Sequence, residues 1–339
     1  MLEVKDLYQN YFYGTNALNG ISFVLNEGEK LAVVSNNGGS KTSLLKCIAG
    51  LFPASSGSIV LNGKDITNLK IKDRGVRLVY DDGGLIRNRS VLFNLTYPLK
   101  IRKMPKNERL SLAYNTAKEY GLEPFVKEMT FRLFTPEIIA LSLSRLELRK
   151  SPLTLIDDVF SLANGKEREE LFNKFLPKLQ KIEGNAIFAT DSIQEAVSFA
   201  DKILILNNGY QDQIGTIAEL KDNPQSLFVD SYVNPQKNHL ICNVIDGVVD
   251  IKGIKIKLPL TYKKDEVFVS YELIPHENGY PFNSVYKKYI GANCYVLINA
   301  DGEKCLNYTP NVISNVLINK STIKIFDRVN EKVLTHELI

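Results

Sequence analysis

Short apolar runs alternate with amphipathic stretches up to about residue 220. Runs such as Leu31–Val34 have the length of buried strands, and the stretches between them carry apolar residues at helical spacing. We expect strands near Leu31–Val34, Leu155–Ile156, Ala186–Ala189 and Ile203–Leu206, and helices near Lys41–Ala49, Asn107–Tyr120, Lys166–Leu179 and Ile193–Ala200. This alternation predicts an α/β domain.

The two ends of the chain have a different pattern. Glu3–Leu7 and Ile21–Leu25 alternate like strands of an antiparallel edge sheet, so the domain should contain a mixed sheet. After Asn234–Gln236 the chain changes to dense β-branched alternation with Gly and Asn at the turns, which predicts a small all-β barrel. We therefore expect one domain over residues 1–235 and a second, independently folding one over residues 236–339.

Composition narrows the class of protein. A chain of 339 residues is long enough for two full cores. Its 42 Lys and Arg residues against 38 Asp and Glu leave a net charge of only +4, so we expect no nucleic-acid partner. The four cysteines have no metal-ligand spacing, the N-terminus does not resemble a secretory signal, and no apolar run approaches a membrane span. We expect a cytoplasmic chain whose membrane role, if it has one, comes through a partner.

The segment Leu31–Leu45, LAVVSNNGGSKTSLL, has the layout of a phosphate-binding loop. An apolar strand leads into a turn and then a helix, and backbone N–H groups at such a helix start face an anion. Lys41 would reach the outer phosphates, and Thr42 would ligate Mg²⁺. Ser35 and Ser40 stand where the motif has its two fixed glycines.

The two serines leave two interpretations open. A residue with a Cβ in the left-handed conformation loses roughly 1–2 kcal/mol, so the loop is either a weakened nucleotide site or a plain strand-turn-helix unit. Gly38 and Gly39 offer part of the turn from a shifted position. Lys41 favours the nucleotide site, because a cation at a helix start is unfavourable unless an anion is present.

A collinear series of further segments resembles the ATP-binding subunit of ATP-binding-cassette (ABC) sugar importers of the maltose-importer type. The resemblance covers nearly the whole chain. It rests on the loop above, Tyr13–Gly14, Glu27–Glu29, Gly57–Gly63, Tyr97–Arg102, Leu153–Asp158, Ala200–Ile203, Asn208–Gly209, Ile214–Thr216 and Ile323–Asp327.

This resemblance implies a P-loop ABC ATPase-type α/β fold with a mixed sheet and a helical subdomain at about residues 88–150. It also implies a C-terminal all-β oligonucleotide/oligosaccharide-type barrel with a regulatory or dimerisation role. The implied cofactors are ATP and Mg²⁺. The implied nucleotide-binding residues are Tyr13, Ser35, Asn36, Asn37, Gly38, Gly39, Ser40, Lys41, Thr42 and Ser43, and the implied metal ligands are Thr42, Asp81 and Asp157. Tyr13 is equally compatible with stacking on adenine and with packing.

The catalytic positions depart from the family pattern. Asp81 stands in place of a glutamine, Asp158 in place of the glutamate that acts as general base, and Asp191 in place of a histidine that donates to the terminal phosphate. Asp158 is one methylene short, and a misplacement of about 1 Å costs on the order of 100-fold in rate. A carboxylate at Asp191 accepts hydrogen bonds and donates none. Asp158 and Asp191 are either residual catalytic groups or surface acids.

The signature that would cap the nucleotide of an opposite subunit aligns with Leu133–Glu137. Its serine and glycines are absent, and Pro136 lacks an N–H. We therefore expect a peripheral importer subunit at the inner face of the membrane, with weak or lost hydrolysis, bound to two permease subunits and a second ATPase subunit. The alternatives are an active homodimeric ATPase that energises uptake and a non-hydrolysing regulator or scaffold.

Overall fold

The computed structural model describes residues 1–10, 16–35, 40–80, 83–251, 253–281, 284–288, 294–298, 304–307 and 315–338. The chain forms two compact units, Met1–Thr216 and Ile217–Ile339. The division falls earlier in the sequence than the predicted boundary at 235/236. In the described residues no helix is both long and apolar enough to cross a membrane.

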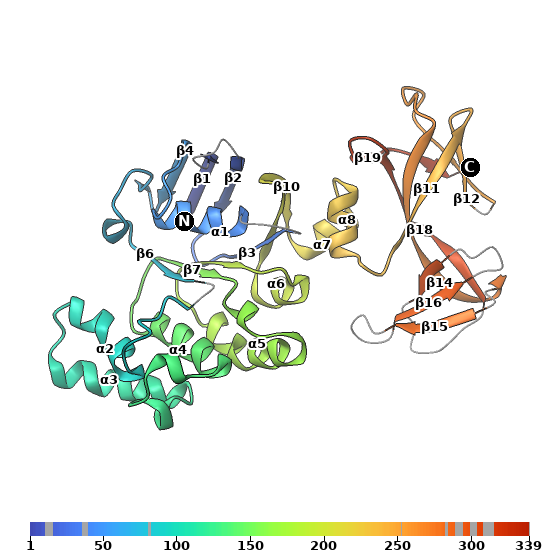
Figure 1. The fold of residues 1–339 in the computed structure, drawn as a ribbon. Helices are drawn as coiled ribbons and strands as arrows, with labels where there is room; N and C mark the ends of the chain where they lie inside the picture. Colours follow the sequence, from blue (N-terminus) through green and yellow to red (C-terminus); the bar gives the residue numbers. More distant parts are fainter. Residues whose placement is uncertain are drawn as a thin grey trace. The chain divides into compact units, whose positions relative to one another are not determined.

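A six-stranded sheet forms the centre of the first unit (Figure 1). Its strand order is β10-β9-β3-β8-β7-β6. The bounds are β3 Lys30–Ser35, β6 Val76–Val79, β7 Leu153–Asp157, β8 Asn185–Ala189, β9 Lys202–Asn207 and β10 Tyr210–Gly215. β10 runs antiparallel to β9 and the other neighbours are parallel, so the predicted mixed sheet is confirmed.

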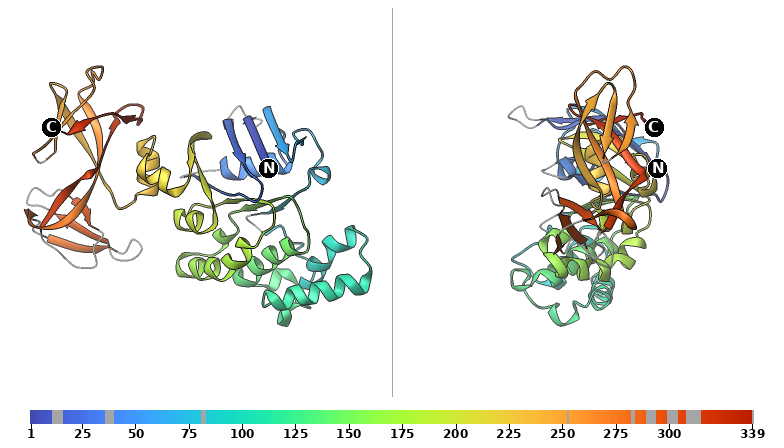
Figure 2. Two further views of the ribbon diagram at one scale, coloured as in Figure 1. Left: turned by 180° about the vertical axis from the view of Figure 1, so that it is seen from behind. Right: turned by 90° about the vertical axis from the view of Figure 1, so that its right-hand side faces the viewer.

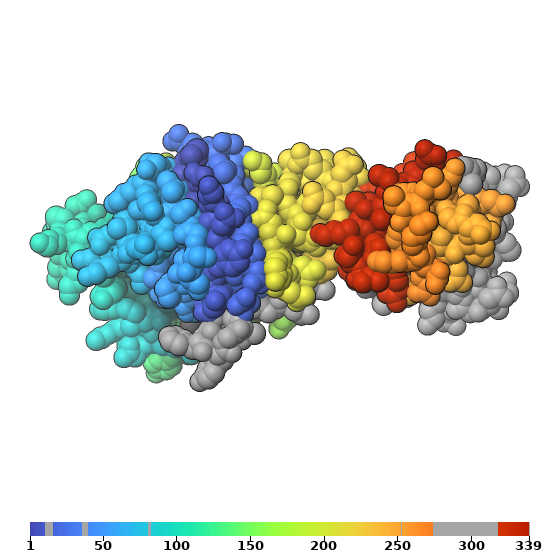
Figure 3. All heavy atoms as spheres, turned by 90° about the horizontal axis from the view of Figure 1, so that it is seen from above, coloured from blue at the N-terminus to red at the C-terminus, as the bar shows by residue number. Residues whose placement is uncertain are grey.

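Four further strands form a second, antiparallel sheet in the order β2-β1-β4-β5. Its strands are β1 Leu2–Asn10, β2 Asn16–Leu25, β4 Ser56–Leu61 and β5 Lys64–Asp65. Helix α1, Ser40–Ala49, lies between the two sheets, and its apolar residues share one core with both of them. The N-terminal segments form much of the outer face of this unit (Figure 3).

The opposite face of the six-stranded sheet is covered by helices (Figure 2). They are α2 Val91–Ile101, α3 Lys106–Glu119, α4 Thr135–Glu147, α5 Gly165–Gln180 and α6 Ile193–Phe199. Successive residues of β7 point to opposite faces of the sheet. Leu155 packs in the core that contains α1, and Ile156 packs in the core that contains α4 and α5. This period of two fixes which side chains reach each layer.

Two helices of this layer were not predicted individually. α2 contains Pro98, which a sequence pattern treats as a break, and α4 is buried over most of its length. A helix buried on several sides lacks a clear polar face, so its 3.6-residue period is weak. The packing of α2 and α4 against the rest of the core decides that they form.

The second unit begins with two short helices, α7 Ile217–Asp222 and α8 Leu227–Val233. A seven-stranded sheet in the order β19-β18-β14-β11-β12-β13-β20 follows, with a separate three-stranded sheet β15-β16-β17. The strands are β11 Asn238–Ile245, β12 Val248–Ile251, β13 Ile254–Lys257, β14 Glu266–Pro281, β15 Ser284–Lys288, β16 Cys294–Ile298, β17 Lys304–Asn307, β18 Asn315–Asp327, β19 Val333–Leu334 and β20 Glu337–Leu338.

The predicted all-β character of the C-terminal region is confirmed. Among the described residues of this unit, the paired strands all run antiparallel. Within the described strands, the outermost members β19 and β20 pair with β18 and β13 but not with each other. The described strands therefore form an all-β half-barrel, in agreement with the all-β fold predicted for this region.

Candidate functional site

The candidate site lies where β3, β7 and β8 end. These strands are parallel. Ala189 at the end of β8 pairs with Val33 of β3 on one side and with Asp157 of β7 on the other. Their carboxyl ends therefore meet at one edge of the sheet, where ligands bind in open α/β folds. Helix α1 begins at Ser40. Its second residue, Lys41, contacts Ser35 at the end of β3, so the helix starts at the same edge.

Lys41 is almost buried at this edge and has two partners. Its side chain is 8% exposed, and its ammonium group forms an ion pair with Asp191, whose side chain is 58% exposed. The same Nζ donates a hydrogen bond to Ser35 Oγ at 3.1 Å. Lys41 was predicted to contact a phosphate. In this structure a carboxylate of the chain itself supplies the negative charge.

Thr42 and Asp157, which were both predicted as metal ligands, lie next to each other. Thr42 Oγ1 donates to Asp157 Oδ1 at 2.9 Å, and Asp157 is fully buried at the end of β7. Among the described residues, no group of three or more His, Cys, Asp or Glu is arranged to hold a metal. One hydroxyl and one carboxylate suit Mg²⁺, which keeps several waters and takes few protein ligands.

Asp158 occupies a strained turn directly after β7. Its backbone is left-handed, with φ 40° and ψ 40°, and its N–H donates to the Ala189 carbonyl at 3.0 Å. The Asp158 side chain is 14% exposed and accepts a hydrogen bond from Arg168 Nη2 at 3.0 Å. Burial raises the pKa of Asp158 to about 7, although Arg168 acts in the opposite direction.

Arg168 holds a network that the sequence analysis missed. Its guanidinium donates to both carboxylate oxygens of Glu195, at 2.6 and 2.9 Å, and to Thr190 Oγ1 at 3.1 Å. Hydrogen bonds to Glu195 raise the pKa of Arg168. Arg168 and Glu195 lie on different helices with no shared motif, so only the fold brings them to Asp158.

The strain expected from the two serines of the loop is absent. Ser35 is the last residue of strand β3, and Ser40 is the first residue of helix α1. Neither strand nor right-handed helix requires the left-handed backbone for which glycine is favoured. The Ser35 hydroxyl also provides a hydrogen-bond acceptor for Lys41 that a glycine would lack. Ser43 is buried within α1.

Several predicted site residues lie outside the described residues. They are Tyr13, Asn36, Asn37, Gly38, Gly39 and Asp81. Their roles in binding nucleotide or metal therefore stay predictions.

The segment aligned with the signature forms the start of α4. Phe134 is 78% exposed, and its backbone N–H donates to Glu137 Oε2 at 3.1 Å. Pro136 lies in the first turn of the helix. The first turn of a helix is where free N–H groups bind anions, so Pro136 removes one such donor and Glu137 occupies another.

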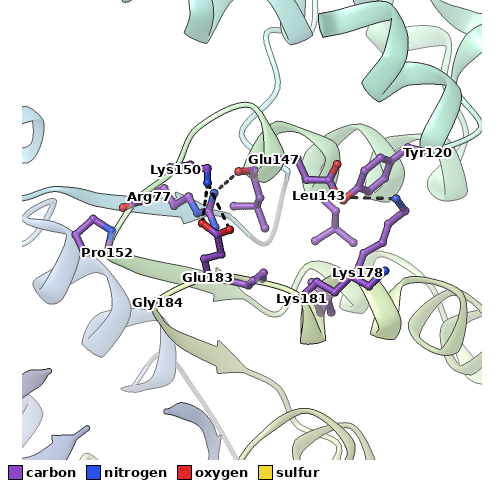
Figure 4. A pocket seen from close by; sticks show the side chains of 14 residues that line it. Arg77, Tyr120, Leu143, Glu147, Lys150, Pro152, Lys178, Lys181, Glu183 and Gly184 are labelled. Atoms are coloured by element: carbon purple, nitrogen blue, oxygen red, sulfur yellow. Dashed lines mark hydrogen bonds and ion pairs between the residues drawn. The ribbon is translucent and has the colours of Figure 1, made fainter. Parts of the chain in front are cut away.

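A separate pocket of about 580 Å³ lies at the opposite edge of the sheet, before β7 and β8 (Figure 4). Its charged side chains are largely paired with one another. Lys150 Nζ lies 3.0 Å from Glu183 Oε2, and the Tyr120 hydroxyl donates a hydrogen bond to Glu147 Oε1 at 2.7 Å. The residues of the predicted nucleotide site do not line this pocket.

Comparisons with known proteins agree with this architecture. The family model described as ABC transporter matches residues 18–161. The sn-glycerol-3-phosphate import ATP-binding protein UgpC of Vibrio vulnificus (strain YJ016) is 30% identical over 261 residues, which cover 76% of this chain and 70% of that protein. The protein of the same name from Rhizobium meliloti (strain 1021) is 29% identical over 244 residues, which cover 71% of this chain and 70% of that protein.

A solved structure is also similar. It is the dimeric, post-hydrolysis state of the ATP-binding cassette MJ0796 bound to ADP and Pi. The TM-score is 0.57 with 20% sequence identity, and the match covers 64% of this chain and 98% of that one. At this identity the likeness shows the fold alone.

Proposed function

The chain belongs to the ABC transporter family of ATP-binding subunits, and from this premise we propose that it is a nucleotide-binding importer subunit with weak or lost hydrolysis. The observation that carries the proposal is a contrast within one site. Thr42 and Asp157 form the pair that suits a Mg²⁺-phosphate group, whereas Asp158 and Asp191 are each engaged by a cation of the chain.

Nucleotide binding rests on the start of α1. Lys41 supplies a nearly buried positive charge, and Thr42 with Asp157 would hold Mg²⁺. A bound Mg²⁺ would neutralise charge on the phosphates. The described residues near the carboxyl ends of β3 and β7 therefore keep the charge arrangement of a nucleotide site.

Loss of hydrolysis rests on three positions. Asp158 is short for a general base and is hydrogen-bonded to Arg168. Asp191 accepts from Lys41, and a carboxylate accepts hydrogen bonds but cannot donate one to a phosphate. Pro136 and Glu137 leave the α4 start with fewer free donors for the nucleotide of an opposite subunit. These defects act at different steps, so restoring one residue should not rescue turnover.

The proposed partners are two permease subunits, with the chain at the inner face of the membrane, and a second ATPase subunit. Tyr97 and Ile101 support a permease contact, because they lie on α2 with 38% and 64% of their surface exposed. The proposed solute is a carbohydrate or a related compound. The relatives named for sn-glycerol-3-phosphate import support this class of solute.

The test is ATP turnover by the purified chain, alone and with its permeases. Lys41→Ala provides the background. We expect turnover close to that background in both preparations. Turnover of about 1 per second or more, which is typical of working enzymes, would contradict the proposal and favour the active homodimeric ATPase.

A further inference from the structure

The Lys41–Asp191 ion pair should affect which nucleotide this site binds. A nearly buried ammonium group needs a counter-charge, and in a phosphate-binding loop the outer phosphates supply it. Here Asp191 already supplies it, and Ser35 Oγ accepts a further hydrogen bond from Lys41 at 3.1 Å. Both partners come from positions where the family pattern has other residue types.

The position of Asp191 is fixed by its neighbours. The Thr190 N–H donates to the Val33 carbonyl at 3.1 Å, which ties this turn to the strand that leads to Lys41. The Ser192 N–H donates to Thr190 Oγ1 at 3.1 Å, and that hydroxyl is held in turn by Arg168. The residues on both sides of Asp191 are therefore anchored, and its carboxylate is directed at Lys41.

We propose that Asp191 is a built-in counter-ion that takes the place of a terminal phosphate on Lys41, so that the site favours a nucleoside diphosphate over a triphosphate. This inference rests on the proposed nucleotide-binding function. A terminal phosphate would have to displace the Asp191 carboxylate or lie beside it. A diphosphate lacks that terminal group, so the ion pair can persist next to it.

The charge on Asp191 should produce a measurable difference between the two nucleotides. Like charges a few ångströms apart repel each other, and the repulsion near a protein surface is larger than in bulk water. Asp191→Asn removes the charge while keeping the size of the side chain, and Asp191 is exposed enough that this variant should fold. Asp191→His goes further, because it introduces a group that can donate to a phosphate.

The experiment is calorimetric titration of the full chain with Mg²⁺-ADP and with Mg²⁺-ATP. We expect ADP to bind at least about tenfold more tightly than ATP to the unmodified chain. In Asp191→Asn and Asp191→His, ATP affinity should rise about tenfold, whereas ADP affinity should change less than about threefold. Thermal melting with each nucleotide gives a second measure that does not depend on activity.

Three controls separate the possible causes. Lys41→Ala should abolish binding of both nucleotides. Lys46→Ala, on the same helix, should retain it. Glu183→Gln removes one exposed acid at the opposite edge of the sheet, where it pairs with Lys150, and should leave the ADP/ATP ratio unchanged.

The outcomes distinguish the inference from the function on which it rests. If both nucleotides bind and the ratio is the same in the unmodified chain and Asp191→Asn, the counter-ion proposal is overturned and nucleotide binding stands. If neither nucleotide binds at millimolar concentration to any variant, nucleotide binding itself fails and the inference fails with it.

Discussion

Two carboxylates at one sheet edge have different environments. The Asp191 side chain is 58% exposed beside Lys41, whereas the Asp158 side chain is 14% exposed beside Arg168. Burial raises the pKa of Asp158 to about 7, and negative charge on Asp191 and Glu195 acts in the same direction. Asp158 is therefore the acid at this edge whose protonation changes near neutral pH.

This environment predicts a pH dependence of stability. The pKa of Asp158 is about 7 in the folded chain, against an ordinary value of 3.8 for an aspartic acid. The folded state therefore binds the proton more tightly than the unfolded state. The protonated Asp158 stabilises the folded chain fully below pH 3.8, and this stabilisation is lost as pH rises through about 7. The free energy of unfolding falls by as much as about 4 kcal/mol as a result.

Chemical unfolding at several pH values between 4 and 8 measures this effect. In Asp158→Asn the fall in unfolding free energy over this range should be smaller than in the unmodified chain. Glu170→Gln is the control, since Glu170 is 65% exposed in a surface pair with Lys166. Equal slopes in the unmodified chain and Asp158→Asn would show that Asp158 does not titrate as the structure indicates.

At the scale of elements, Arg168 connects three parts of the site. It lies on α5, Glu195 lies on α6, and Asp158 begins the turn after β7. Glu195 is only 6% exposed, so the pair is largely removed from water. Removing one member of a buried pair leaves the other charge uncompensated.

We predict that Arg168→Ala lowers the free energy of unfolding by about 3–5 kcal/mol. Urea unfolding followed by circular dichroism measures this loss. Lys166→Ala is the matched control, because Lys166 lies on the same helix in an exposed pair with Glu170 at 3.3 Å. Such surface pairs contribute about 0–1 kcal/mol. Similar effects of the two substitutions would contradict a structural role for the Arg168 network.

At the scale of the whole chain, the second unit contains a buried polar cluster around Asp230 on α8. Asp230 is fully buried and lies 3.1 Å from Lys237 Nζ, and it also accepts from Asn234 and Ser270. Burial acts to raise the pKa of Asp230, but the nearby His239 ring at 3.5 Å, the hydrogen bond from Ser270 and the charge of Lys237 outweigh it and hold that pKa well below its usual value. The cluster joins α8 to β11 and β14.

The cluster around Asp230 predicts that the independently folding second domain includes α8. A fragment of residues 236–339 lacks Asp230 but keeps Lys237, which is 6% exposed in the full chain. We predict that residues 217–339 unfold cooperatively, and that residues 236–339 have a lower unfolding free energy by about 3 kcal/mol or more, because a buried ion pair is broken. Circular dichroism with urea compares the two fragments. Equal stability would support the boundary predicted from composition.

The predicted part of the fold is the part with local periodicity. Strands such as β3 and β8 and helices such as α1 and α5 were found within a few residues, because their apolar runs are short and bounded by polar turns. α4 was not, because it is buried on several sides. The all-β character of the C-terminal half-barrel was predicted, but the order of its strands was not, because strand pairing joins residues that are distant along the chain.

The sequence alone determined the α/β order and the family, and it identified Thr42 and Asp157 as candidate metal ligands. Each of these depends on residue type at a fixed place along the chain. The tertiary structure decided that Asp191 neutralises Lys41, that Arg168 engages Asp158, and that Ser35 and Ser40 adopt regular backbone conformations. These contacts join residues on separate strands and helices, and an ion pair depends on distance and burial, which spacing along a chain does not specify.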